Sequence, residues 1–114
     1  VLDRRVPEIV RERLGADVDH VLSAAGLTRR DIARWICHPG GPRVLSAIQA
    51  ALELRDEQLA LAWQTLAATG NLSSVSVLMV LRATLAAPRP PRGAHGMLVA
   101  VGPGFCSETA LIRW

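Results

Sequence analysis

The stretch Trp35-Ile36-Cys37-His38-Pro39-Gly40-Gly41-Pro42 joins a short apolar run to a turn that is rich in glycine and proline. Residues 33–37 have the length and composition of a buried β-strand, so the sequence predicts a strand that ends at Cys37. His38 follows the strand directly, and Pro-Gly-Gly-Pro predicts a turn. A helical pattern begins just after the turn. The sequence therefore places one titratable side chain at a strand end, beside backbone that carries few side chains.

Apolar residues at helical or strand spacing flank this stretch on both sides. The predicted helices cover residues 7–25, 43–53, 56–69 and 73–86, and the predicted strands cover 33–37, 96–101 and 109–114. Gly15 is expected to interrupt the first helix and Gly26 to end it. Thr28 and Asp31 are spaced as an acidic variant of the capping box. The two later strands are expected to pair antiparallel, and the whole pattern predicts a layered α/β fold.

The helix predicted over residues 73–86 has almost no polar face. Its apolar residues are Val75, Val77, Leu78, Met79, Val80, Leu81 and Leu85. A helix that is apolar all round is typical of the interior of a larger fold, and 114 residues are too few to cover it. The first residues contain neither an initiator Met nor a signal peptide. We therefore expect a single domain over residues 1–114 that is completed by a second half outside this chain.

The composition excludes several classes of protein. Half of the residues are hydrophobic, so the chain should bury a core. The 13 basic residues are all Arg and are scattered without interleaved aromatic residues, which argues against nucleic acid as a partner. No apolar run approaches the roughly 20 residues of a membrane span. Cys37 and Cys106 lack metal-site spacing, and two thiols fit a reducing compartment. We therefore expect a soluble, cytoplasmic protein.

Two turns that contain glycine carry side chains that can donate hydrogen bonds. His38 offers an imidazole N–H, and Asn71, within Gly70-Asn71-Leu72-Ser73-Ser74, offers an amide NH₂. Two such donors aimed at one carbonyl oxygen form an oxyanion hole. Both residues also have structural interpretations. A histidine at a strand end is often structural, and Asn71 could cap the helix that follows.

Cys37 is not expected to be a nucleophile. Adjacent residues of a strand point to opposite faces, so Cys37 should face away from His38 and pack as a core thiol. Ser73 and Ser74 could simply begin the helix.

The chain resembles the C-terminal part of type III polyketide synthases, the chalcone and stilbene synthase superfamily. Three stretches carry the resemblance in the family's order and spacing, and it covers essentially the whole chain. They are residues 35–42, residues 70–78, and Gly102-Pro103-Gly104-Phe105 with Glu108 and the closing Leu111-Ile112-Arg113-Trp114. The resemblance implies a thiolase-like fold of two similar halves, of which this chain is the C-terminal one, with a buried central helix.

The resemblance also implies a Cys-His-Asn catalytic set. His38 falls on the family's histidine and Asn71 on its asparagine, while the cysteine belongs to the N-terminal half. An acyl starter passes from CoA to that cysteine, malonyl-CoA is decarboxylated, and the resulting carbanion attacks the thioester. The implied partners are an acyl-CoA starter, malonyl-CoA, the N-terminal half of the same enzyme and a second copy in a homodimer. Neither a metal nor a bound redox cofactor is implied.

Further positions are assigned through the same resemblance. Gly40, Gly41 and Arg43 align with the turn near the CoA tunnel, and Ser73 and Gly102-Pro103-Gly104 align with the cavity lining. The guanidinium of Arg43 could contact a CoA phosphate or could face solvent.

Two other functions remain open from the sequence. A ketoacyl synthase of the fatty-acid initiation type shares the fold and the Cys-His-Asn set, but typically continues its histidine with Gln-Ala-Asn. Here His38 is followed by Pro-Gly-Gly, which favours the polyketide synthase. The second alternative is a non-catalytic, truncated domain that only binds a partner. The sequence does not indicate the starter or the product, although the composition leans toward bacterial products such as alkylresorcinols, alkylpyrones or a tetrahydroxynaphthalene.

Overall fold

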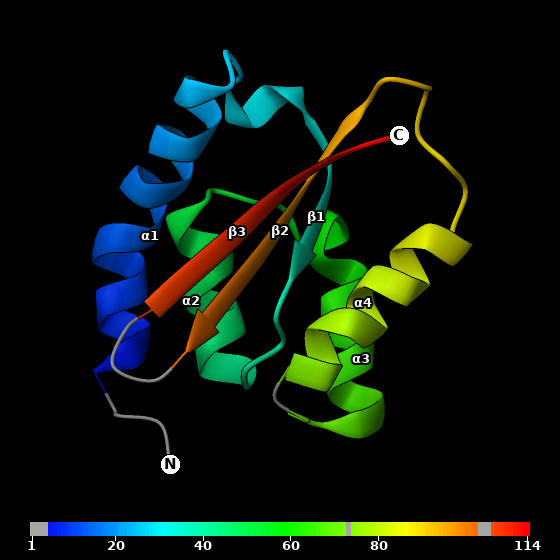
Figure 1. Ribbon diagram of the computed structural model, residues 1–114. Coiled ribbons are helices and arrows are strands. Elements are labelled where there is room, and N and C mark those ends of the chain that lie inside the picture. Colours follow the sequence, from blue (N-terminus) through cyan, green and yellow to red (C-terminus); the bar gives the residue numbers. More distant parts are fainter. Residues whose placement is uncertain (1–4, 73, 103–105) are drawn as a thin grey trace.

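The computed structural model describes residues 5–72, 74–102 and 106–114 (Figure 1). Its elements, in order, are α1 (Val6–Ala24), η1 (Arg29–Asp31), β1 (Ile32–Cys37), α2 (Pro42–Ala51), η2 (Asp56–Leu59), α3 (Ala60–Thr69), α4 (Ser74–Ala86), β2 (His95–Gly102) and β3 (Cys106–Arg113). The predicted α/β class is confirmed. The helix expected over 56–69 is divided into a 3₁₀ turn, η2, and the α-helix α3.

The strands form a sheet in the order β1-β2-β3 within the described part of the chain. β1 pairs parallel with β2, whereas β2 and β3 pair antiparallel, as predicted. Helices α1 and α2 lie on one side of the sheet and α3 and α4 on the other (Figure 1). Met97, Val99 and Val101 are buried and alternate with more exposed residues along β2, which is the period of a strand.

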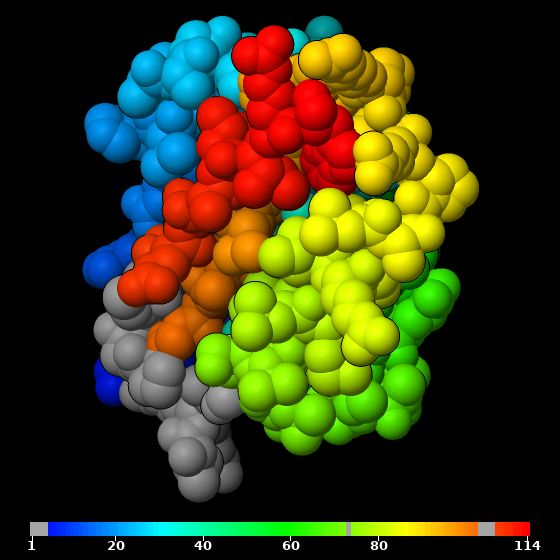
Figure 2. All heavy atoms as spheres, turned by 45° about the vertical axis from the view of Figure 1, so that its right-hand side comes forward, coloured from blue at the N-terminus to red at the C-terminus, as the bar shows by residue number. Residues whose placement is uncertain are grey.

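Helix α4 is covered on one side only. Ser76, Val77, Val80 and Thr84 are buried, whereas the large apolar side chains of Leu72, Val75, Leu78 and Leu85 are 48%, 52%, 58% and 53% exposed. Figure 2 shows the side chains of α4, in yellow-green, on the surface beside β2 and β3. Val75, Leu78 and Leu85 of α4, together with Leu72 just before it, therefore form an apolar face that the described residues leave open.

Gly15 does not interrupt α1, contrary to the sequence prediction. The helix runs unbroken from Val6 to Ala24. A Cβ atom at Gly15 would lie 3.0 Å from Nη2 of Arg29 and 3.1 Å from the carbonyl oxygen of Ala51. Glycine is therefore used here for close packing, because its missing side chain lets the end of α2 and the Arg29 guanidinium approach the helix.

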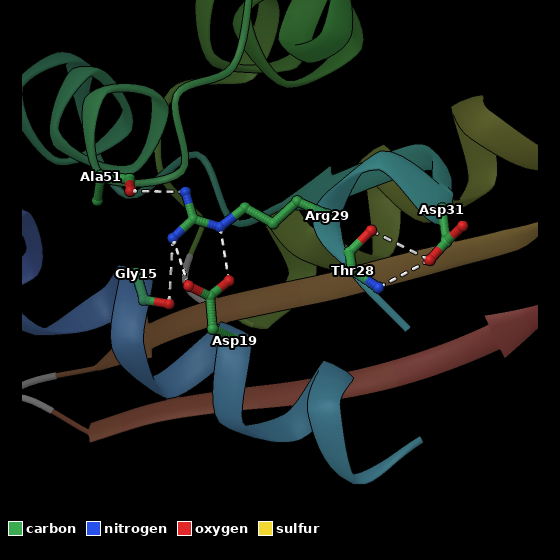
Figure 3. A network of polar contacts seen from close by, with 6 residues as sticks. All are labelled: Gly15, Asp19, Thr28, Arg29, Asp31 and Ala51. Atoms are coloured by element: carbon green, nitrogen blue, oxygen red, sulfur yellow. Dashed lines mark hydrogen bonds and ion pairs between the residues drawn. The ribbon is translucent and has the colours of Figure 1, made fainter. Parts of the chain in front are cut away.

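The guanidinium of Arg29 ties three elements together (Figure 3). Nε and Nη2 donate to the two carboxylate oxygens of Asp19 in α1, at 2.7 Å and 2.9 Å. Nη1 donates to the carbonyl of Ala51 in α2 and Nη2 to that of Gly15, each at 3.3 Å. A planar fork of donors suits this arrangement, because it serves a carboxylate and two carbonyl groups at once.

We expect Arg29→Ala to lower the free energy of unfolding by about 1–2 kcal/mol, because two carbonyls and a carboxylate lose a charged donor. Arg29→Lys should recover little of this, since an ammonium cannot reproduce the fork. Arg30→Ala is the matched control, because Arg30 is an exposed neighbour. Urea unfolding followed by circular dichroism measures all three variants. Equal effects of Arg29→Ala and Arg30→Ala would contradict the prediction.

The signals for the end of α1 and the start of η1 are confirmed. Gly26 has a φ of +73° and donates its N–H to the carbonyl of Ser23, as a glycine that ends a helix does. Asp31 accepts hydrogen bonds from the backbone N–H and the hydroxyl of Thr28, at 2.8 Å and 3.2 Å. In the described part of the chain, every helix is too short or too polar to cross a lipid bilayer.

Candidate active site

His38 follows β1 and remains attached to the sheet. Its backbone N–H donates to the carbonyl of Val99 at 2.8 Å, which extends the pairing of β1 with β2 by one residue. Its ring lies over Gly40. A Cβ atom added at Gly40 would be 3.6 Å from both Cε1 and Nδ1 of the imidazole. The Nε2 atom is buried and has no hydrogen-bond partner among the described residues. A buried polar atom without a partner is unusual, and in a candidate site it points to a ligand group.

The turn after His38 joins the sheet to α2. Gly40 donates its N–H to the carbonyl of His38 at 2.9 Å, which makes the turn tight. Gly41 has a φ of +124° and precedes α2, so a side chain at this position would strain the backbone. Arg43 lies in the first turn of α2 and is exposed. Of the two glycines, only Gly41 requires its residue type for backbone conformation.

Asn71 lies on a different connection, between α3 and α4. Gly70 ends α3 with a φ of +67°, as predicted, and its N–H donates to Leu66. The Asn71 side chain is exposed, and its Nδ2 donates to the carbonyl of Gly40 at 3.5 Å. Helix α4 begins at Ser74, three residues after Asn71. The structure thus brings the amide of Asn71 to the turn that carries His38.

Ser76 also belongs to this region, although the sequence reasoning did not single it out. It is fully buried in the first turn of α4. The N–H of Leu72 donates to its Oγ at 2.6 Å, and Oγ donates to the carbonyl of Gly70 at 3.5 Å. The sequence offered one signal for Ser76, which is its place between two apolar residues, Val75 and Val77.

The carboxyl ends of β1 and β2 meet at one edge of the sheet, because these strands run parallel. Gly102 ends β2 at this edge. Both α2 and α4 begin near the same end of the sheet (Figure 1). The start of a helix favours negative charge, so this edge suits an anionic group. The remaining predicted positions, Ser73, Pro103 and Gly104, lie outside the described residues.

Two further features carry no assignment. In the described ranges, no group of three or more His, Cys, Asp and Glu residues could hold a metal ion. A groove of about 390 Å³ runs along α2, η2 and the start of α3 and includes none of the predicted site residues. Polar groups in this groove already pair with one another, since Gln49 donates to Asp56 and accepts from the indole of Trp63.

Cys37 is fully buried on β1 and pairs with Val99 of β2. Burial raises the pKa of its thiol from 9.0 to about 12. Because only the thiolate is a good nucleophile, Cys37 is unsuited to attack a thioester at neutral pH. The geometry agrees with the sequence interpretation of a core thiol.

We expect Cys37→Ala to leave any activity that depends on His38 and Asn71 close to its original rate, while it lowers stability by about 1 kcal/mol through lost packing. A large loss of product formation in a folded variant would identify Cys37 as catalytic.

The pH dependence of stability offers a second test of Cys37. The folded chain keeps the thiol proton at higher pH than the unfolded chain does, so this stabilising contribution is complete below about pH 9 and lost as the pH approaches 12. The sequence contains neither Lys nor Tyr, so few other side chains titrate there. Urea unfolding of the 114-residue chain across this range should show a steeper loss of stability than the same measurement on Cys37→Ala.

Comparison with known proteins identifies the family. Residues 1–114 match the family described as chalcone and stilbene synthases, C-terminal domain. The chain belongs to the chalcone and stilbene synthase family.

Two relatives in this family come from bacteria of the genus Streptomyces. The chain is 51% identical over 114 residues to 1,3,6,8-tetrahydroxynaphthalene synthase of Streptomyces peucetius subsp. caesius, covering 100% of this chain and 30% of that protein. It is 35% identical to 3,5-dihydroxyphenylacetyl-CoA synthase of Streptomyces toyocaensis, covering 99% of this chain and 29% of the relative. The chain therefore spans about 30% of the length of these relatives.

A solved structure confirms the fold. The crystal structure of 1,3,6,8-tetrahydroxynaphthalene synthase from Streptomyces coelicolor A3(2), described as a bacterial type III polyketide synthase, superposes with a TM-score of 0.90 at 32% identity. The match covers 100% of this chain and 32% of that one. The resemblance to type III polyketide synthases, and with it the thiolase-like fold, is confirmed.

Proposed function

We propose that the full-length protein is an acyltransferase that condenses an acyl-CoA starter with malonyl-CoA, and that this chain supplies the histidine and asparagine of its Cys-His-Asn site. One observation carries the proposal. The Nε2 atom of His38 is buried and has no hydrogen-bond partner in the part of the chain that the structure describes, and it lies beside the turn that the Asn71 amide contacts. Two donors that come from different connections and meet at one turn suit a single oxygen that gains negative charge.

The proposed chemistry assigns a role to each donor. Decarboxylation breaks the bond between the malonyl carboxylate and the methylene carbon, carbon dioxide leaves, and the electron pair moves into the thioester as an enolate. Nε2 of His38 and Nδ2 of Asn71 donate hydrogen bonds to the enolate oxygen. The carbanion then attacks the acyl group on the catalytic cysteine, a new carbon–carbon bond forms, and the cysteine thiolate leaves.

That cysteine is proposed to lie in the N-terminal half of the same enzyme. The open apolar face of α4, which lies beside the Asn71 connection, supports this arrangement, because such a surface calls for a covering partner. The full-length enzyme is proposed to be a cytoplasmic homodimer. By itself, the 114-residue chain should not complete a catalytic cycle.

The CoA thioesters are proposed to approach along the turn of Gly40, Gly41 and Arg43. Arg43 is exposed in the first turn of α2, so its guanidinium is free to meet a phosphate. Gly102 lies at the same edge of the sheet, and Ser73, Pro103 and Gly104 are proposed to line the cavity with it. No bound cofactor or metal is needed for these steps.

The 51% identity to a tetrahydroxynaphthalene synthase favours one product class. We propose that the enzyme uses malonyl-CoA both as starter and as extender, and releases a tetrahydroxynaphthalene. The alternative ketoacyl synthase is disfavoured because the whole chain matches the chalcone and stilbene synthase family. The remaining alternative, a non-catalytic binding domain, predicts no turnover at all.

An assay of the full-length enzyme with radiolabelled malonyl-CoA tests the proposal. Malonyl-CoA alone should release carbon dioxide and yield a tetrahydroxynaphthalene, identified by mass spectrometry. If condensation required a fatty acyl-CoA, the product class would be wrong but the polyketide synthase function would stand. If neither condition released carbon dioxide from a folded enzyme, the proposed function would be wrong.

A further inference from the structure

One buried hydroxyl contacts both neighbours of Asn71. The N–H of Leu72 donates to Ser76 Oγ at 2.6 Å, and the hydroxyl donates to the carbonyl of Gly70 at 3.5 Å. The Gly70 carbonyl belongs to the peptide plane before Asn71, and the Leu72 N–H belongs to the plane after it. Since φ and ψ of Asn71 are the rotations between these two planes, Ser76 restrains the backbone that aims the Asn71 amide.

We propose that Ser76 is a positioning residue for Asn71 in the decarboxylation and condensation steps. This inference rests on the proposed function. A donor in an oxyanion hole must lie within a few tenths of an ångström of its best position. The side chain of Asn71 is exposed, and its 3.5 Å contact with Gly40 is at the outer limit of a hydrogen bond. The contact of Ser76 with Leu72, at 2.6 Å, is shorter than this one and acts on the backbone directly after Asn71.

A purely structural role for Ser76 makes different predictions. The hydroxyl stands in the first turn of α4, where side chains commonly satisfy free backbone N–H groups. Thr69 Oγ1 also lies 3.5 Å from the Gly70 carbonyl, but this hydroxyl has one proton and donates it to the carbonyl of Thr65 at the shorter distance of 2.9 Å. If the hydroxyl served only the helix, its loss would lower stability without a specific effect on the catalytic rate.

Thr84 provides a matched control in the same helix. It is 5% exposed, and its Oγ1 donates to the carbonyl of Val80 at 2.7 Å. Thr84 lies about three helical turns from the start of α4 and so from the Asn71 connection. Thr84→Val removes one buried hydroxyl from α4, as Ser76→Ala does. Both variants should lose similar stability, but only Ser76→Ala should lower activity.

The variants are compared in the full-length enzyme with malonyl-CoA, and kcat and KM are measured for carbon dioxide release. Ser76→Ala should lower kcat about 10- to 100-fold with little change in KM, because a misplaced donor weakens the transition state more than substrate binding. Ser76→Thr restores the hydroxyl and should recover part of kcat. An unchanged kcat in folded Ser76→Ala, or an equal loss in Thr84→Val, would overturn the proposal.

The double variant Ser76→Ala/Asn71→Ala provides the sharper test. If Ser76 acts through Asn71, removal of the hydroxyl should cost nothing further once the Asn71 amide is gone. Multiplicative losses would show that Ser76 acts independently and would overturn the inference. Should Ser76→Ala not fold, Ser76→Cys replaces it in the same cycle, because a thiol keeps the volume and is a weaker acceptor. An Asn71→Ala enzyme with full activity would instead overturn the role proposed for Asn71, while the condensing activity itself would stand.

Discussion

Replacing His38 with Gln in the full-length enzyme should lower malonyl-CoA decarboxylation by about 10²- to 10³-fold. The imidazole lies against Gly40, and its Nε2 is buried and unpaired among the described residues, so this nitrogen is available to an incoming oxygen. A glutamine amide can donate a hydrogen bond, but its longer, more flexible chain does not hold the donor in that place. The lost rate should appear mainly in kcat, because the bond to the oxygen strengthens as negative charge develops.

His20→Gln is the matched control for this substitution. His20 is exposed on α1, on the other side of the sheet from α4, and the same change of side chain there should leave both decarboxylation and stability unaltered. Both variants are assayed by release of labelled carbon dioxide, with circular dichroism to verify folding. A folded His38→Gln enzyme that matched His20→Gln in rate would show that the imidazole is structural.

Leu78→Arg should have opposite consequences in the 114-residue chain and in the full-length enzyme. Leu78 is 58% exposed on the open face of α4, so in the short chain an arginine there reaches water. Stability of the short chain should change by no more than about 0.5 kcal/mol, and self-association should decrease. If the proposed N-terminal half covers this face in the full-length enzyme, the same arginine becomes a buried charge, which costs about 3–5 kcal/mol when it is unpaired.

Leu78→Met is the control that changes the shape of the side chain without adding a charge. Methionine has nearly the volume of leucine, so it should be tolerated in both the 114-residue chain and the full-length enzyme. Thermal unfolding and size-exclusion chromatography report stability and association, and product formation reports the assembled enzyme. If Leu78→Arg left the full-length enzyme stable and active, the N-terminal half would not cover this face of α4.

The alternation and periodicity of apolar residues were sufficient to predict the helices, the strands and their α/β arrangement. Local signals with a direct steric cause were also reliable, as Gly26 and Gly70 show through their positive φ values. Gly15 was misinterpreted because its role depends on Arg29 and Ala51, which reach it only after folding. Sequence spacing carries no information on which distant backbone will need the space of a missing side chain.

In the candidate site, too, local features could be predicted from the sequence, whereas features that depend on tertiary packing could not. His38 and Asn71 were named from their turns and from the family resemblance, but their convergence on Gly40 is a product of tertiary packing. Ser76 was missed because a serine near a helix start is common, and its burial became visible only when α4 packed against β1. The buried Nε2 of His38 likewise required coordinates, since the sequence does not show which atoms lack partners.

The parallel pairing of β1 with β2 also has a consequence for the order of folding. The backbone hydrogen bond between His38 and Val99 closes a long loop of chain, because α2, α3 and α4 lie between the two residues in the sequence. Such nonlocal contacts carry a large loop-closure entropy and form late, whereas the local packing of α1 on α2 can form early. The segment that orients the imidazole should therefore become ordered near the end of folding. A partly folded chain could hold most of its helices and still lack the geometry needed for catalysis.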